Sequence, residues 1–161
     1  MTTTTADAIR DRIIAVIAAL APTSLPDRFA PFRNEEAADF ATWASQNADA
    51  AWRRFQVRDT GDYTPPAVSN TDVSEEIVTF AIYVAYPQTS RGGAKNALDR
   101  DRVMKEDQRQ IDEAVGLGGA ANFTDPFPNA SWRGSKTTRK VVAGVDMLVV
   151  TQTMGFWQAA I

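Results

Sequence analysis

The run Glu76-Ile-Val-Thr-Phe-Ala-Ile-Tyr-Val-Ala-Tyr86 decides the fold, because almost every position holds a β-branched, aromatic or other apolar residue. β-branched and aromatic residues are enriched in strands, where they pack well on a pleated surface. Pro87 follows at once and has no N–H group with which to continue a ladder of hydrogen bonds. The sequence therefore predicts a strand over Val73–Tyr86.

Two further segments have the pattern of strands. Trp52–Arg58 alternates Phe55 and Val57 with polar residues, as a strand does when one of its faces is buried. Lys140–Phe156 carries apolar residues on both sides, which is typical of a central strand. The connections are expected to be irregular: Asp59–Asp72, Gln88–Asn96 and Ala120–Arg139. The first is long enough to be an interaction element.

Three segments have the periodicity of helices. The first is expected to begin at Ala6, with Thr5 as its cap, and to end before Pro22, since its apolar residues recur every three or four positions. Asn34 would cap a second helix. The third covers Leu98–Val115 and ends at a run of glycines.

The order of these elements is helix, helix, strand, strand, helix, strand. It predicts an α+β domain, a single β-sheet with helices packed on one face. The 161 residues suffice for one domain with a core. We expect a flexible polar tail over Met1–Thr5 and a single domain over residues 6–161.

Composition excludes several function classes. The chain has no cysteine and no histidine, which removes disulfides, thiolate nucleophiles, Ser-His-Asp chemistry and most zinc sites. An enzyme would have to use carboxylates, lysine or tyrosines such as Tyr63, Tyr83 and Tyr86. No motif supports one, so we expect no enzyme, catalytic residue, cofactor or metal. The net charge of −3 does not favour binding to the outside of nucleic acid.

The sequence also shows no targeting signal and no membrane helix. No apolar run reaches the ~18 residues of a membrane helix, and the first residues do not resemble a secretory signal. We therefore expect no membrane partner and a place in the cytoplasm or in an assembly built there.

The densest charge lies along Asp99–Glu113, on the third predicted helix. A metal site fits poorly, because its acids do not share one face and basic residues stand between them. A solvated face with i,i+4 pairs is a second interpretation, with Asp101 near Lys105 and Asp112 near Arg109. A third is a contact with the complementary charges of another subunit.

Other conspicuous motifs have ordinary explanations. Arg91–Gly93 with Lys95 lacks the spacing of a phosphate-binding loop, and Gly116–Gly119 follows a helix rather than a strand. The basic stretch Trp132–Lys140 could contact nucleic acid, but the chain as a whole is acidic. The aromatic tail Met154–Trp157 either covers the core or anchors in a neighbouring subunit.

Three runs together resemble a known family. They are Phe80-Ala-Ile-Tyr-Val-Ala-Tyr-Pro87, the charged Asp107-Gln-Arg-Gln-Ile-Asp112, and the final Val145-Asp-Met-Leu-Val-Val-Thr-Gln-Thr-Met-Gly-Phe156. With an amphipathic helix before them, they resemble the tail terminator, or tail-completion, proteins of long-tailed bacteriophages. The related head–tail connector and neck proteins are similar in size and in the order of elements.

The resemblance implies a virion structural protein, assembled in the host cytoplasm. It implies a homo-oligomeric ring, a hexamer, that caps the tail tube protein and joins the tail to the head–tail connector proteins. DNA would pass through its pore without sequence-specific binding. A connector, or stopper, protein of the neck is the first alternative, and a small non-viral protein-binding adaptor is the second.

Subunit or partner contacts are expected on the Asp59–Asp72 and Gln88–Asn96 loops, the charged helix face and the C-terminal tail. The candidate residues are Asp62, Tyr63, Arg91, Lys95, Arg100, Arg102, Asp107, Arg109 and Trp157.

Overall fold

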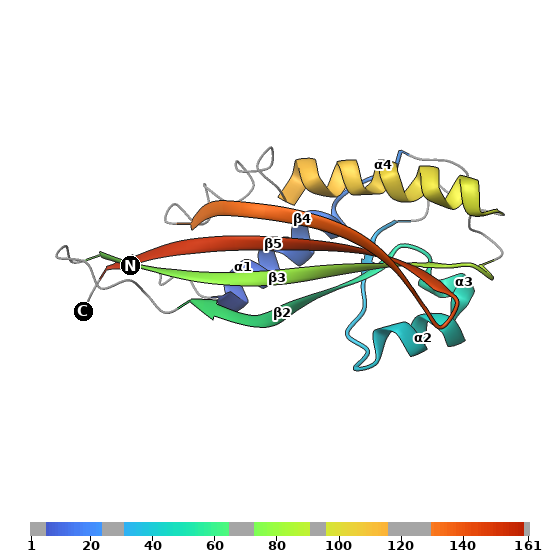
Figure 1. Cartoon of the computed structure of the whole chain (residues 1–161), viewed down its shortest axis with the longest axis horizontal. Coiled ribbons are helices and arrows are strands. Elements are labelled where there is room, and N and C mark those ends of the chain that lie inside the picture. Colours follow the sequence, from blue (N-terminus) through green and yellow to red (C-terminus); the bar gives the residue numbers. More distant parts are fainter. Residues whose placement is uncertain (1–5, 24–30, 65–72, 91–95, 116–129, 160–161) are drawn as a thin grey trace.

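The computed structural model describes residues 6–23, 31–64, 73–90, 96–115 and 130–159. Its elements are α1 (Ala6–Ala18), β1 (Arg33–Asn34), α2 (Phe40–Gln46), α3 (Ala48–Ala51), β2 (Arg54–Thr64), β3 (Val73–Pro87), α4 (Ala97–Val115), β4 (Ala130–Val142) and β5 (Val145–Ala159). The strands form one five-stranded sheet in the order β1-β2-β3-β5-β4 (Figure 1). The predicted α+β class with a single sheet is confirmed.

The centre of the sheet is the long antiparallel pair β3 and β5. Their register runs from Val73 opposite Ala159 to Pro87 opposite Val145. β2 and β4 flank this pair, each antiparallel to its neighbour, and the short β1 runs parallel to β2. The strand predicted over Val73–Tyr86 is therefore confirmed, and so is the central position of the final strand.

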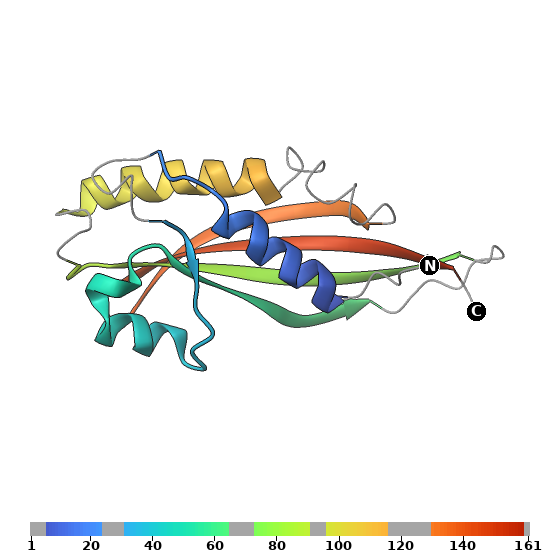
Figure 2. The same cartoon turned by 180° about the vertical axis from the view of Figure 1, so that it is seen from behind.

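Alternate residues of the central strands face two separate cores. Ile82, Val84 and Leu148 belong to the larger one, which α1 and α4 cover. Ala81, Ala85, Met147 and their neighbours form a smaller core with α2 and α3, on the opposite face at one end of the sheet (Figures 1 and 2). The two long helices share one face, but the second predicted helix, α2, lies with α3 on the other face, so the prediction that the helices pack on one face is correct only for α1 and α4.

The first and third predicted helices form as expected. On α1 the spacing of Ile9, Ile13 and Ile17 puts all three side chains on one face, and each is fully buried. On α4 the buried stripe runs through Val103 and Ile111. Burial of these faces against the sheet stabilises both helices more than local propensity does.

The second predicted helix begins later than the sequence indicated. Asn34 is not its cap but part of β1, because the neighbouring N–H groups bond to the edge of β2: that of Glu35 donates to the carbonyl of Phe55 at 2.9 Å. The cap of α2 is Asp39, whose carboxylate accepts a hydrogen bond from the backbone N–H of Thr42 at 3.3 Å.

β2 continues beyond Arg58 to Thr64, so the predicted loop is wrong over residues 59–64. The register shifts between Asp59 and Tyr63, which marks a β-bulge. A bulge accommodates the polar, glycine-containing sequence in an outer strand. The rest of the predicted loop, residues 65–72, lies outside the described residues.

The segment predicted as irregular up to Arg139 and as one strand from Lys140 is instead a hairpin. β4 is its first arm, and the turn holds Ala143 at φ 54° and Gly144 at φ 77°. Two positive φ values indicate a type I′ turn, whose twist matches that of the flanking strands. The basic stretch of the sequence therefore forms an outer strand of the sheet.

β2 and β4, which flank the central pair, each have a β-bulge, and the two bulges lie at the same position along the strands. In β4 the register shifts between Trp132 and Gly134, next to Thr153 of β5. In β2 the shift lies beside Thr79 of β3, and Thr79 is itself the partner of Thr153.

Candidate interaction surfaces

The predicted contact residues fall into three groups. Arg100, Arg102, Asp107 and Arg109 are on α4. Asp62 and Tyr63 lie in β2 and Trp157 in β5, but their side chains are outside the described ones. Arg91 and Lys95 lie outside the described residues altogether.

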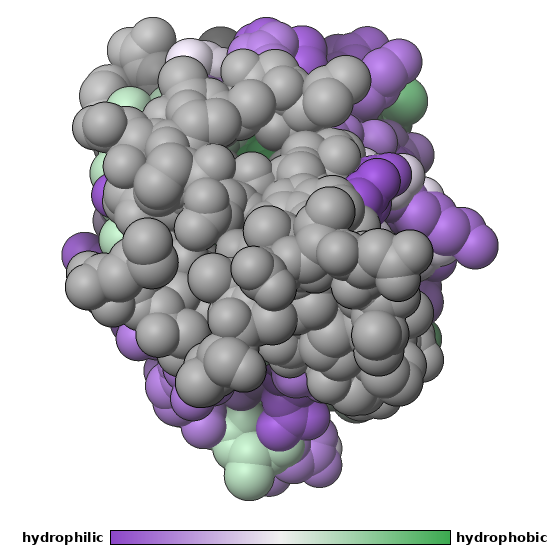
Figure 3. Space-filling view, turned by 90° about the vertical axis from the view of Figure 1, so that its left-hand side faces the viewer, coloured by the Kyte–Doolittle hydropathy of each residue, from purple (hydrophilic) through white to green (hydrophobic). Residues whose placement is uncertain are grey.

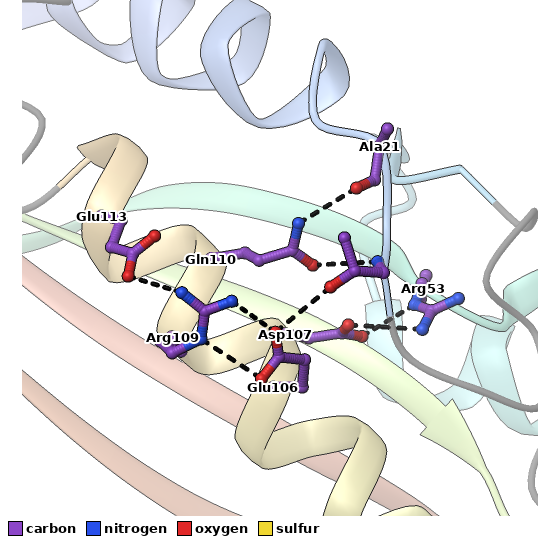
Figure 4. Close-up of polar contacts among 8 residues, drawn as sticks. Ala21, Arg53, Glu106, Asp107, Arg109, Gln110 and Glu113 are labelled. Atoms are coloured by element: carbon purple, nitrogen blue, oxygen red, sulfur yellow. Dashed lines mark hydrogen bonds and ion pairs between the residues drawn. The ribbon is translucent and has the colours of Figure 1, made fainter.

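Asp107 is not a surface residue, and its assignment as a contact is wrong. Its carboxylate is fully buried, where it accepts hydrogen bonds from Arg53 Nε at 2.7 Å and Nη2 at 3.3 Å (Figure 4). The hydroxyl of Tyr86 donates to the same carboxylate at 2.7 Å. A buried charge requires such partners, so Asp107 joins α4 to the sheet.

The surroundings of this cluster are apolar. The guanidinium carbon of Arg53 lies 5.8 Å from the ring centre of Phe32, and Trp52 meets Tyr86 edge-on at 5.2 Å. Burial, followed by the charge of Asp107, raises the pKa of Tyr86 well above its ordinary value. These groups have no exposed surface, so they are not available to a partner, and their bonds link α4 to the sheet.

Sequence reasoning missed Arg53 and misjudged Asp107, although one signal was present. Asp107 stands four positions after Val103 and four before Ile111, within the stripe of α4 that faces the core. An acid inside a buried stripe requires a buried cation or donor. The sequence does not show which cation, because Arg53 is 54 positions away.

The outward side of α4 is a network of ion pairs. Arg109 bonds to Glu106 and, at 2.6 Å, to Glu113 (Figure 4), and Arg102 lies 4.0 Å from Asp99. These side chains are about half exposed or more, except that of Glu106. The expected i,i+4 pairing is therefore present, but between Arg109 and Glu113 rather than at the predicted positions.

Other charges of α4 reach the β-hairpin. Arg100 donates to Asp146 at 2.9 Å, and both side chains are largely buried. Asp101 accepts a hydrogen bond from Arg139 of β4 at 3.3 Å, so it faces this strand rather than Lys105. Arg100 is thus held inside the subunit, whereas Arg102 and Arg109 remain on its surface.

α4 is also tied to the segment that follows α1. The side chain of Gln110 donates to the carbonyl of Ala21 at 3.0 Å and accepts from the N–H of Thr23 (Figure 4). The hydroxyl of Thr23 donates to Glu106 at 3.1 Å. These bonds keep the two long helices together on their face of the sheet.

One outer side of the sheet is basic, and the other carries charges of both signs. β4 contains no acidic residue, and its exposed cations are Arg133, Lys136, Arg139 and Lys140. The opposite side is formed by α1, β1 and β2, which contact one another. Its exposed charges have both signs: the acids are Asp7, Asp11, Glu36 and Asp59, and the cations are Arg33 and Arg58. The sequence showed the basic stretch but not its position along one edge.

Few large apolar side chains are exposed among the described residues. Val141 and Leu98 are 62% and 60% exposed, and Val142 is 36% exposed. Leu98 begins α4, and the two valines end β4. From the opposite end of the molecule, the coloured part of the surface is mainly hydrophilic (Figure 3).

A cavity of about 270 Å³ lies between α2 and the second face of the sheet. Phe40 and Met147 are among its apolar residues, and Arg58 and Lys140 bring positive charge to it. The ammonium of Lys140 lies 5.1 Å from the ring centre of Tyr83, a cation–π distance. Asp39 supplies an acid, so the cavity does not concentrate one sign of charge.

Neither a metal site nor a membrane segment is found in the part of the chain that the structure describes. No group of three or more acidic side chains there could hold a metal ion, and no helix there is both long and apolar enough to cross a membrane. Comparison with models of protein families finds none that matches the chain, and comparison with curated proteins finds no significant match.

Proposed function

We propose that this protein is a virion structural protein of the tail terminator type, which forms a ring on the tail tube of a long-tailed bacteriophage. In this role it ends the growth of the tube and provides the surface to which the head is joined. DNA passes through the pore of the ring without sequence-specific binding. The partners are further copies of the chain, the tail tube protein and the head–tail connector proteins.

One observation carries the proposal: the charged groups of the domain are arranged for contact rather than for chemistry. Three buried ionisable groups, Arg53, Asp107 and Tyr86, bond to one another inside the core. Exposed charges of both signs lie along the helix α4 and along two opposite sides of one sheet. Charged surfaces of this kind give specificity and orientation to the contacts between proteins.

The geometry also suits a ring. A closed ring needs two different surfaces on each subunit, one for each neighbour. A sheet with two unlike sides supplies such a pair. The outward side of α4, with Arg102, Lys105 and Arg109, remains for a contact along the tail axis.

The experiment that tests the proposal uses tail tube protein from the same phage. We expect the purified chain to stop tube polymerisation when added during assembly, so that electron micrographs show tubes with a ring at one end. Bovine serum albumin at the same concentration is the control for non-specific effects. Binding to portal-side proteins without capping the tube would assign the chain to the connectors, and binding to neither would refute a role in the tail.

A further inference from the structure

The second face of the sheet, opposite α1 and α4, is covered only at one end. α2 and α3 pack there on Ala81, Ala85 and their neighbours. Figure 1 looks at this face, and beyond the two short helices no helix lies in front of the four long strands. Thr79, Thr151 and Thr153 lie half-buried at the centre of this open part, which no described element covers.

Three exposed cations stand at the borders of this open part. Arg58 of β2 lies opposite Ala81, and Lys140 of β4 lies opposite Met147. Ala81 and Met147 belong to the core of the second face, and side chains directly opposite each other share a face. Lys136 is four positions before Lys140, so the alternation of β4 places it on this face as well.

The spacing of these cations follows from the register. Arg58 is level with Lys136, through Ala81 and Thr151. Three strand spacings separate the two positions, roughly 14 Å, and Lys140 lies roughly 13 Å further along β4. Positive charge therefore flanks the central threonines from both outer strands.

None of the three cations forms an ion pair with a described acid. Arg58 donates to the carbonyl of Ala38 at 3.1 Å, and the ammonium of Lys140 lies over the ring of Tyr83. By contrast, acids of the chain pair with Arg10, Arg53, Arg100, Arg109 and Arg139. The charges of the second face are thus available to an anion from outside the subunit.

The acids near this face lie at its covered end. The described ones are Glu35, Asp39 and Asp49, and the cations Arg33 and Arg54 accompany them. Asp59 follows Arg58 along β2 but lies opposite Phe80 of the larger core, so it takes the other face. Over the open part, the described side chains of the second face are cationic or uncharged.

The net charge of −3 does not decide what this face binds. At about 0.1 M salt, exposed charges more than about 10 Å apart are largely screened from one another. The acids of α1 and α4 lie across the sheet, so an anion on the second face meets mainly its cations.

We propose that the open part of the second face binds the phosphate backbone of duplex DNA, with Arg58 at one border and Lys136 and Lys140 at the other. Cations and hydroxyl donors are the groups that contact phosphates, and such contacts do not depend on base sequence. The roughly 14 Å between the borders suits phosphates on the two sides of a major groove about 12 Å wide. An acidic peptide lying along the strands occupies one strand spacing, about 4.8 Å, and would reach one border only. The inference goes beyond the proposed function, which assigns no surface to DNA, and it does not depend on the capping of a tail.

Fluorescence anisotropy of a labelled duplex of about 20 base pairs tests the contact, with the full chain added at several salt concentrations. Each neutralised phosphate contributes about −0.9 to the slope of the logarithm of the association constant against that of the salt concentration, so three contacts predict a slope of about −2.7. A second duplex of unrelated sequence should bind equally well, because no base is read.

Removal of the cations should make this slope shallower in steps. Lys136→Gln with Lys140→Gln leaves one contact and a slope of about −0.9, and Arg58→Gln leaves two and a slope of about −1.8. The matched control is Lys105→Gln, which removes an exposed cation of α4 that forms no ion pair with a described acid, and it should bind as the wild type does. Circular dichroism verifies that each variant is folded.

The inference fails if the wild type does not bind the duplex at about 20 mM salt, where electrostatic binding is strong. It also fails if Lys105→Gln weakens binding as much as the double lysine variant does. Polyglutamate that displaces the duplex at a lower concentration than unlabelled DNA would assign the face to an acidic protein segment instead. Capping of tail tubes is measured separately, so its failure would refute the role in the tail and leave the DNA contact standing.

Discussion

Arg53 and Asp107 are separated by 54 positions, and their side chains meet at 2.7 Å in the core with no exposed surface on either. The backbone of Arg53 has φ 60°, a conformation that residues other than glycine rarely adopt. Its N–H donates to the carbonyl of Ala85 at 2.9 Å. The ion pair and this bond together hold the residue at the point where the chain enters β2.

Removal of the buried anion should strongly destabilise the domain. Asp107→Asn removes the anion that bonds to the buried cation of Arg53, and breaking a buried ion pair in this way costs ~3–5 kcal/mol. Urea unfolding followed by circular dichroism measures the loss. The control is Glu106→Gln, which removes a partly exposed partner of Arg109 and should cost less than ~1 kcal/mol. An equal loss of unfolding free energy in the two variants would mean that the buried ion pair stabilises the domain no more than the exposed one.

Alkaline pH should destabilise the protein through Tyr86. Burial and the charge of Asp107 raise the pKa of Tyr86 in the folded state above its ordinary value of 10.0. Its contribution to stability is therefore complete below pH 10.0 and decreases as the pH rises further, because the unfolded chain loses the phenol proton first. In Tyr86→Phe, the free energy of unfolding should decrease less steeply above that pH than in the wild type. Tyr83→Phe is the control for the loss of a phenol group.

Two carboxylates should respond to acid in opposite ways. Burial raises the pKa of Asp112, so its ionised form opposes folding, and the wild type gains stability as the pH falls from the folded pKa toward the ordinary value of 3.8. Asp112→Asn should be more stable than the wild type at neutral pH, and this advantage should fade in acid. Unfolding free energies at several pH values measure it. An advantage that stays constant with pH would argue against burial as the cause.

Glu36 provides the matched comparison. Hydrogen bonds from Asn34 and then Arg10 lower the pKa of Glu36, so its contribution to stability is present above the ordinary value of 4.5 and is lost as the pH falls through the folded pKa. Glu36→Gln should be less stable than the wild type at neutral pH and equal to it in strong acid. A small effect is expected, because the side chain is 57% exposed.

The turn between β4 and β5 offers a stabilising substitution. Ala143 occupies a left-handed position at φ 54°, which asparagine tolerates better because its side chain can bond locally. Ala143→Asn should raise the free energy of unfolding by up to ~1 kcal/mol. Gly144→Ala, at φ 77°, should lower it. A thermal melt of each variant would reveal the sign, and stabilisation by Gly144→Ala would contradict the assigned turn.

Much of the fold could be predicted from local patterns. The isoleucines of α1, the apolar run of β3 and the stripe of α4 each follow the period of their element, so burial and sequence agree. β4 could not be predicted in this way. Its segment Lys136–Lys140 is an outer strand exposed over much of its length, so no alternation of apolar residues was required.

The hairpin and the contact surfaces show a second limit of local reasoning. Gly144 was a weak turn signal, because an alanine precedes it where asparagine or aspartate is usual. The partners of Arg53 and the arrangement of charges along two sides of the sheet depend on strand order. That order brings β5 between β3 and β4, and no single segment of sequence specifies it.

The bulges beside Thr79 and Thr153 also act against the assembly of such a chain into fibres. The two hydroxyl oxygens lie 3.1 Å apart at the centre of the sheet, at the height where both outer strands depart from regular pairing. A flat sheet with two regular edges could recruit copies without limit, as amyloid does. Here the bulges increase the local twist at both borders. Added copies would rotate relative to one another, which opposes an endless flat ribbon.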